Sequence, residues 1–179
     1  MVVIISNTSP IILLARVDAL NLVLKVFNID KFSITQEAFD EIKDANTRGK
    51  TLKLIDEGKL EVLPKATDNA ALHKIAYEVA LANPKPDPKT WRIEQHLGEA
   101  SVILSGEKNK VEFVLMDDIG GRQIANKRGL KCLHHFDIIK QAVKKSILSK
   151  KDAYSHLCAL EKEYKYENAE YYKELWSNG

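Results

Sequence analysis

The first sixteen residues constrain the fold of this chain most strongly. Residues 2–5 are apolar at every position, which is typical of a strand that is buried on both faces. The polar residues 6–9 then lead to Pro10, which suits the first turn of a helix because it has no N–H group to leave unpaired. Residues 11–15 are apolar again and continue this helix, and Ser9 is its expected cap. A buried strand that passes directly into a helix predicts a parallel sheet covered by helices.

The rest of the chain alternates short apolar strands with longer helical segments. Further strands are expected at 32–34, 59–63, 113–116 and 130–133, and helices at 20–27, 36–42, 68–81, 98–104, 119–128 and from 136 onwards. Three prolines within 84–88 mark a loop. This order predicts an α/β fold with a central parallel sheet flanked by helices. Because such sheets bind ligands beyond the carboxyl ends of their strands, that edge is where functional residues are expected.

Length and composition fit one ordinary domain. The chain has 179 residues, of which 45% are hydrophobic and 29% charged, and its net charge is +2. Lysine is spread along the chain, so charge alone does not mark a nucleic-acid-binding protein. Neither a signal peptide nor an apolar run near the roughly 20 residues that cross a bilayer is seen. We therefore expect a cytoplasmic protein without membrane contact.

Polar residues gather where the expected strands end and the next helices begin. The first strand is followed by residues 7–9, and the acidic residues in such places are Glu41, Glu99, Asp117 and Asp118. Mg²⁺ and Mn²⁺ prefer carboxylate oxygens and can activate water for phosphodiester cleavage. Each of these residues also has a structural explanation as a helix cap, a turn residue or a solvated acid. The argument for a metal site therefore depends on their common position at one edge of the sheet.

These elements resemble those of PIN-domain proteins, most closely a compact PIN-like branch of unknown function found near toxin–antitoxin loci. The similarity lies in residues 3–15 (VIISNTSPIILLA), 37–42 (EAFDEI), 97–100 (LGEA), 114–118 (VLMDD) and the short strand 129–133. It covers about residues 1–148. The resemblance implies a PIN-like three-layer sandwich over 1–148, with residues 149–179 as a helical C-terminal extension packed on the same domain.

The resemblance also implies an activity and a set of site residues. The implied activity is hydrolysis of RNA by a ribonuclease that uses Mg²⁺ or Mn²⁺, of a toxin type or an RNA-processing type. The implied metal ligands are Asn7, Glu41, Glu99 and either Asp118 or Asp117, and the four acids among them are the implied catalytic residues. In this family the last acid often follows a Thr or Ser by two places. Here that place is Met116 if Asp118 is the match, so the assignment between the two aspartates stays open.

Three further residues complete the implied site. Thr8 and Ser9 would offer hydroxyl groups to a metal-bound water or a phosphate, and Arg122 would meet a phosphate or pair with a carboxylate. The implied partners are RNA, a second copy of the chain in a homodimer, and a small antitoxin protein.

Position 7 departs from the family pattern, in which Asp is usual. Asn7 offers a neutral carbonyl oxygen, so the site loses one negative charge. Two interpretations follow: Asp117 supplies the missing charge, or the protein is a weak or inactive nuclease that acts as an RNA-binding or protein-binding module. Convergence of Glu41, Glu99 and Asp118 would favour the enzyme, and outward-facing, solvated carboxylates would favour the binding module. A haloacid-dehalogenase-type phosphatase is disfavoured because it needs an Asp nucleophile at this place.

The histidines give weaker signals. His96 precedes Glu99 by three residues, but Gly98 argues against a continuous helix there. His134 and His135 stand at a strand end and are interpreted as surface or capping residues. Neither pair has the spacing of a closed zinc site.

Overall fold

A five-stranded parallel sheet forms the centre of the computed structural model, which describes residues 3–83 and 92–164. The strands are β1 (Ile4–Ser6), β2 (Phe32–Thr35), β3 (Leu60–Leu63), β4 (Phe113–Leu115) and β5 (Cys132–Leu133), and they lie in the order β3-β2-β1-β4-β5. Every pairing between neighbours is parallel. The central strand is β1, which is buried at all three positions, as expected for a strand covered on both faces.

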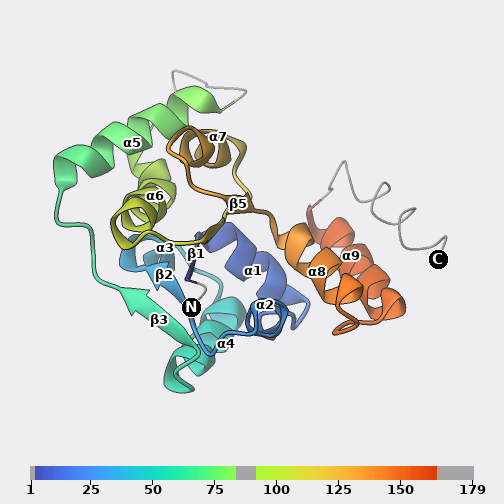
Figure 1. Ribbon diagram of the computed structural model, residues 1–179. Coiled ribbons are helices and arrows are strands. Elements are labelled where there is room, and N and C mark those ends of the chain that lie inside the picture. The colour runs from blue at the N-terminus through green and yellow to red at the C-terminus, as the bar shows by residue number, and fades with distance from the viewer. Residues whose placement is uncertain (1–2, 84–91, 165–179) are drawn as a thin grey trace.

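Helices cover both faces of the sheet, which confirms the predicted α/β sandwich (Figure 1). One layer contains α3 (Gln36–Asp40), α5 (Asn69–Ala82), the 3-10 turn η1 (Ile93–His96), α6 (Leu97–Asn109) and α7 (Ile119–Lys127). The other contains α1 (Thr8–Arg16), α2 (Asn21–Phe27), α4 (Ala45–Asp56), α8 (His135–Lys144) and, packed on α8, α9 (Lys150–Tyr164). Within the described ranges no helix has both the length and the apolar character to cross a membrane.

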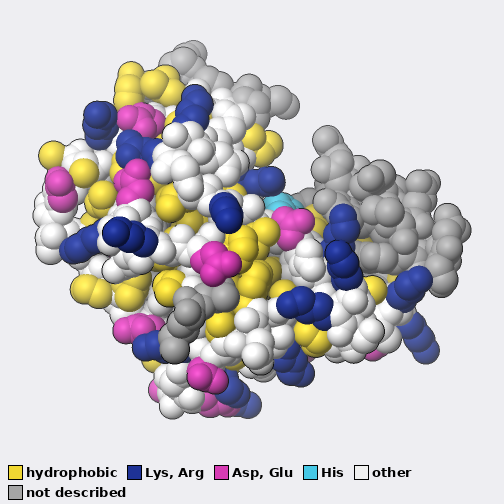
Figure 2. Space-filling view, in the orientation of Figure 1, with side chains coloured by type: hydrophobic (Ala, Val, Ile, Leu, Met, Phe, Trp, Pro, Cys, Tyr) yellow, Lys and Arg dark blue, Asp and Glu magenta, His cyan; other side chains and the backbone are white. Residues whose placement is uncertain are grey.

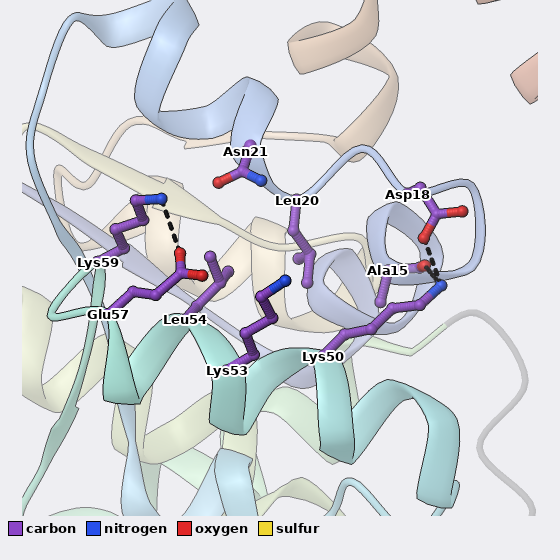
Figure 3. Close-up of a pocket in the computed structure, with 9 residues that line it drawn as sticks. All are labelled: Ala15, Asp18, Leu20, Asn21, Lys50, Lys53, Leu54, Glu57 and Lys59. Atoms are coloured by element: carbon purple, nitrogen blue, oxygen red, sulfur yellow. Dashed lines mark hydrogen bonds and ion pairs between the residues drawn. The ribbon is translucent and has the colours of Figure 1, made fainter.

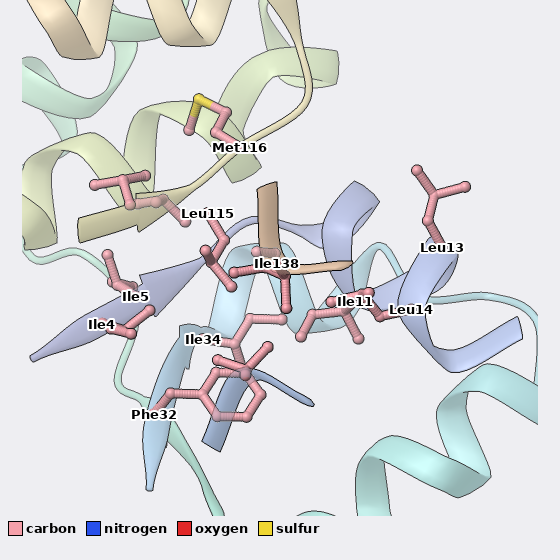
Figure 4. Close-up of a cluster of buried hydrophobic side chains, with 14 of the residues drawn as sticks. Ile4, Ile5, Ile11, Leu13, Leu14, Phe32, Ile34, Leu115, Met116 and Ile138 are labelled. Atoms are coloured by element: carbon pink, nitrogen blue, oxygen red, sulfur yellow. The ribbon is translucent and has the colours of Figure 1, made fainter. Parts of the chain in front are cut away.

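The core between these layers is built from the strands and from the first helix. Ile5, Ile34 and Leu115 are fully buried on three adjacent strands, and Ile11 of α1 belongs to the same buried cluster (Figure 4). Side chains buried on both faces hold β1 rigidly, because large apolar groups each contribute about 1.5–3 kcal/mol when removed from water. The residues that follow β1 are therefore positioned by the most buried part of the molecule.

Some local expectations were confirmed and others were wrong. The helices expected at 36–42 and 68–81 are present as α3 and α5, and Thr35 and Asp68 cap them by accepting hydrogen bonds from Ala38 N (3.3 Å) and Ala71 N (2.9 Å). Ser9 is not the cap of α1, because the helix already begins at Thr8 and Asn7 occupies the N-cap position. The proline loop and the aromatic residues after 164 lie outside the described residues.

Helix α4 was not anticipated. Its buried positions are Thr47, Thr51 and Leu54, so two of the three are polar and the apolar periodicity is weak. A capping residue does mark its start in the sequence: Asp44 caps the helix by accepting a hydrogen bond from Thr47 N at 2.9 Å.

A pocket of about 300 Å³ opens between α4 and the segment that joins α1 to α2 (Figure 3). Its charges are mixed: Lys50 pairs with Asp18 at 2.6 Å and Lys59 with Glu57 at 2.7 Å. None of the candidate site residues lines it.

Candidate functional site

The candidate residues lie at the carboxyl ends of β1 and β4, where the strand order reverses. The chain leaves β1 towards β2 on one side and leaves β4 towards β5 on the other, so the helices after these strands cover opposite faces. Asn7 follows β1 directly and is tied to β4 by a hydrogen bond from its backbone N to Leu115 O (2.8 Å). This reversal is the usual ligand position in open parallel sheets.

Asn7 and Glu99 form the buried centre of the site. Asn7 is fully buried, and its Nδ2 donates to Glu99 Oε1 at 3.0 Å. Glu99 lies in the first turn of α6 and is 9% exposed. Asn7 stands at the N-cap position of α1, but its side chain makes no cap hydrogen bond to that helix. A pattern that usually marks a helix cap therefore serves to hold a buried carboxylate.

Glu41 reaches the same place from the end of α3. Its Oε1 accepts from Gly98 N at 3.1 Å, and its Oε2 lies 2.7 Å from the hydroxyl of Thr8. The Thr8 hydroxyl is also 2.9 Å from Ala38 O, so its single proton serves one acceptor at a time. A Cβ at Gly98 would overlap the Glu41 carboxylate, so a side chain at this position would displace the end of Glu41.

The helix around Gly98 corrects one expectation. Gly98 lies inside α6, which follows η1 without a break, and His96 Nδ1 is 3.9 Å from Glu99 Oε2. That distance is too long for a hydrogen bond. Among the residues that the structure describes, Glu99 Oε2 is buried and has no hydrogen-bond partner.

Charge repulsion and burial act together on these acids. Burial, together with the negative charges of Glu41 and Asp118, raises the pKa of Glu99 to about 7 against the opposing hydrogen bond from Asn7. Burial also raises the pKa of Glu41, against the opposing hydrogen bonds from Thr8 and Gly98. Such shifts mark carboxylates that lack a compensating cation.

The two neighbouring aspartates point to different places. Asp118 caps α7 by accepting from Gly121 N at 2.6 Å, and its charge acts on Glu99. Asp117 instead accepts from the backbone N and from Nδ1 of His135, both at 2.9 Å. The structure therefore groups Asp118, and not Asp117, with Glu41 and Glu99.

The histidines at the start of α8 form a second cluster with Asp117. His134 Nε2 is 3.3 Å from Asp117 Oδ1, and His134 Nδ1 accepts from Phe136 N, so the predicted capping role is confirmed. Burial lowers the pKa of His134 to about 4, which leaves it neutral at pH 7. His135 is fully buried, so its interpretation as a surface residue was wrong. Sequence spacing did not reveal this cluster, because it depends on the pairing of β4 with β5.

The remaining predicted contacts lie around the site in different ways. Ser9 is half-buried in the first turn of α1, next to the buried Thr8. Arg122 is half-buried on α7, where its charge acts on Cys132 and His134, against the burial that raises the pKa of Cys132 to about 11. Arg122 therefore lies on the Asp117 side of the edge.

Comparison with known proteins agrees with this geometry. Residues 3–178 match a family model described as a PIN domain, a nuclease-like fold whose members generally use divalent metals. No curated protein matches the chain. A match over nearly the whole chain, together with the parallel sheet and the acids at its carboxyl edge, shows that this protein belongs to the PIN-domain family.

Proposed function

We propose that this protein is a ribonuclease that depends on Mg²⁺ or Mn²⁺ and hydrolyses phosphodiester bonds of RNA. One observation carries the proposal: Glu99 is buried between two other carboxylates and keeps one oxygen without a hydrogen-bond partner among the described residues. A site that maintains such repulsion at a cost in stability is expected to bind a cation.

The donor set fits a hard divalent cation. Glu41, Glu99 and Asp118 would hold it, together with the carbonyl oxygen of Asn7, and all four donors are oxygens. Within the described part of the chain, these three acids are not among the groups whose ligand atoms all lie within 4.8 Å of one another. Because two oxygens bound to one Mg²⁺ lie at most about 4.2 Å apart, at least one of these acids would hold the ion through one of its waters. When bound, such an ion supplies activation of water and neutralises charge on the phosphodiester.

The chain's own residues hold this site in a fixed shape. Asn7 orients Glu99, Thr8 and the Gly98 N–H orient Glu41, and the Gly121 N–H orients Asp118. Each orienting group belongs to a strand end or a helix start next to the buried sheet. Little reorganisation is then needed during reaction, which is where such sites gain most of their rate.

The proposed substrate, RNA, would contact the protein through its phosphates. Ser9 is half-buried in the first turn of α1 and Arg122 is half-buried on α7, and both would meet phosphates of the RNA. A homodimer and a small antitoxin are the further partners that membership of the family suggests. A basic side chain from such a partner would complement the acidic site.

Asp118→Asn is expected to abolish metal-dependent cleavage while leaving the fold intact. Asparagine caps a helix as well as aspartate does, so α7 keeps its start while the site loses a charge. The assay is cleavage of single-stranded RNA with Mn²⁺ or Mg²⁺, beside an EDTA control. We expect a loss of at least about 100-fold, the range seen when a charge-stabilising group is removed from an active site.

Asp44→Asn is the matched control. Asp44 caps α4 in the same way, away from the site, so this variant should cleave like the wild type. Cleavage that survives EDTA and Asp118→Asn would contradict the proposal. A wild type that binds RNA without cleaving it would favour the non-catalytic binding module.

Gly98→Ala is expected to lower cleavage about tenfold or more with little loss of stability. The added methyl group displaces only the flexible end of Glu41. Alanine also favours a helix interior over glycine by up to about 1 kcal/mol. The measurement pairs the cleavage rate with a thermal melt of the same sample.

Gly49→Ala provides the comparison for this variant. Gly49 lies in α4 with open space where its Cβ would be, so it should gain helix stability and keep full activity. Equal activity of the two alanine variants would show that Glu41 is not needed in its observed position.

A further inference from the structure

We propose that Asp117, His134 and His135 form a second metal site, selective for a borderline transition ion such as Zn²⁺, next to the acidic site. Their ligand atoms all lie within 4.8 Å of one another. Asp117 follows β4 and the histidines follow β5, and these strands are parallel neighbours, so the fold itself brings the three residues together. This site is independent of the proposed nuclease activity.

The separations between ligand atoms suit tetrahedral coordination. Bonds of about 2.0–2.1 Å to zinc place neighbouring ligand atoms about 3.3 Å apart. Here Asp117 Oδ1 is 3.3 Å from His134 Nε2, and Asp117 Oδ2 is 2.9 Å from His135 Nδ1. These two contacts use different oxygens of Asp117, so the carboxylate would turn to bring one of its oxygens to the ion.

The chemistry of the donors separates this site from its neighbour. Two imidazoles and one carboxylate favour zinc and similar ions, whereas the all-oxygen site around Glu99 favours magnesium or manganese. Three protein ligands also leave a fourth position for water, as in open zinc sites.

The rings are held in place and one of them reaches solvent. Phe136 stacks on His134 with centroids 5.0 Å apart, and it contacts the His135 ring at 4.0 Å. The His134 side chain is 19% exposed, while that of His135 is fully buried. Figure 2 shows a small patch of histidine surface on this face of the molecule.

Metal binding changes which nitrogen of the His134 ring carries the proton. Phe136 N–H donates to His134 Nδ1 at 3.3 Å, so the proton of that ring lies on Nε2 and points at Asp117. When an ion binds Nε2, this proton moves to Nδ1, and the hydrogen bond from Phe136 N is lost. Asp117 keeps its hydrogen bond from the backbone N of His135, which holds the carboxylate in position.

The test is titration of the full chain with Zn²⁺ in excess Mg²⁺, which occupies the all-oxygen site. We expect one equivalent of zinc to bind, and His134→Asn to weaken binding by at least 10–100-fold, the loss usual even for outer-shell changes at metal sites. Asparagine retains an oxygen near the place of Nδ1 and can still cap α8. His73→Asn, an exposed position on α5, should bind zinc like the wild type.

Two further measurements keep the result decisive. The visible spectrum of the Co²⁺ form of the wild type should show nitrogen ligation even if His134→Asn folds poorly. Glu99→Gln should keep this spectrum while losing RNA cleavage, so failure of the nuclease proposal and failure of this one are distinguishable. Absence of zinc binding in excess Mg²⁺, or equal binding by His134→Asn, would mean that the cluster is only a hydrogen-bonded clamp between β4 and α8.

Discussion

Glu99→Gln is expected to stabilise the metal-free protein at pH 8 by roughly 3 kcal/mol while removing RNA cleavage. Burial and the charges of Glu41 and Asp118 raise the pKa of Glu99 from its ordinary value of 4.5 to about 7. Each unit of such a difference corresponds to about 1.4 kcal/mol between the protonated and ionised forms. Glutamine keeps an oxygen for the hydrogen bond from Asn7 and carries no charge, so the repulsion disappears.

The sign of the pH dependence follows from the direction of this shift. The folded protein holds the Glu99 proton more tightly than the unfolded chain does, so folding is favoured most below pH 4.5. This contribution is lost as the pH rises to about 7. The advantage of Glu99→Gln is therefore expected to be small at pH 4.5 and full at pH 8.

Urea denaturation in EDTA at the two pH values measures the effect. Glu94→Gln, at an exposed position of η1, is the control and should change stability by less than about 0.5 kcal/mol at either pH. Added Mg²⁺ should raise the melting temperature of the wild type and not that of Glu99→Gln. A glutamine variant that is less stable than the wild type at pH 8 would show that Glu99 is not under repulsion.

The fold was predictable because its strongest signals are local. The apolar run at 2–5, the caps Thr35 and Asp68 and the alternation of elements all depend on neighbouring residues. Helix α4 was not predicted because its buried face is largely threonine. The Thr51 hydroxyl donates a hydrogen bond to Thr47 O at 2.8 Å. Because the helix backbone provides the hydrogen-bond partner of this hydroxyl, the polar residue can be buried, and the sequence alone does not reveal that it is.

The site was predictable as a position but not as a set of contacts. Asn7 and Asp118 could be predicted to lie near each other, because each follows a strand and the ends of parallel strands meet at one edge of the sheet. Sequence could not separate Asp117 from Asp118, since consecutive residues after a strand diverge according to how the next helix starts. It also could not show that Gly98 makes room for Glu41, because that contact joins residues 57 positions apart.

Asn7 keeps the metal-free site stable in a way that an aspartate could not. Its amide donates to Glu99 Oε1, and it adds no charge to a place where three carboxylates already repel one another. An aspartate at this position would put a fourth carboxylate about 3 Å from Glu99. The asparagine thus exchanges some metal affinity for stability without metal.

Asn7→Asp is therefore expected to lower the stability of the metal-free protein by about 3–5 kcal/mol, the usual cost of an uncompensated buried charge. The same change should tighten Mg²⁺ binding by about tenfold or more, because affinity rises with the number of charged ligands. Calorimetric titration with Mg²⁺ and thermal melts with and without the metal measure the two effects. Lower stability together with tighter Mg²⁺ binding would indicate electrostatic repulsion, because a simple loss of packing would lower stability without strengthening metal binding.

Asn126→Asp, on the exposed side of α7, adds the same charge outside the site and should change neither quantity much. Unchanged metal affinity in Asn7→Asp would mean that position 7 does not contact the cation. If only Asn7→Asp cleaves RNA, the fold and the site are right and the native protein is a weakened member of its family. If both proteins cleave, a neutral oxygen at position 7 is sufficient, because the three surrounding carboxylates already supply the charge that the ion requires.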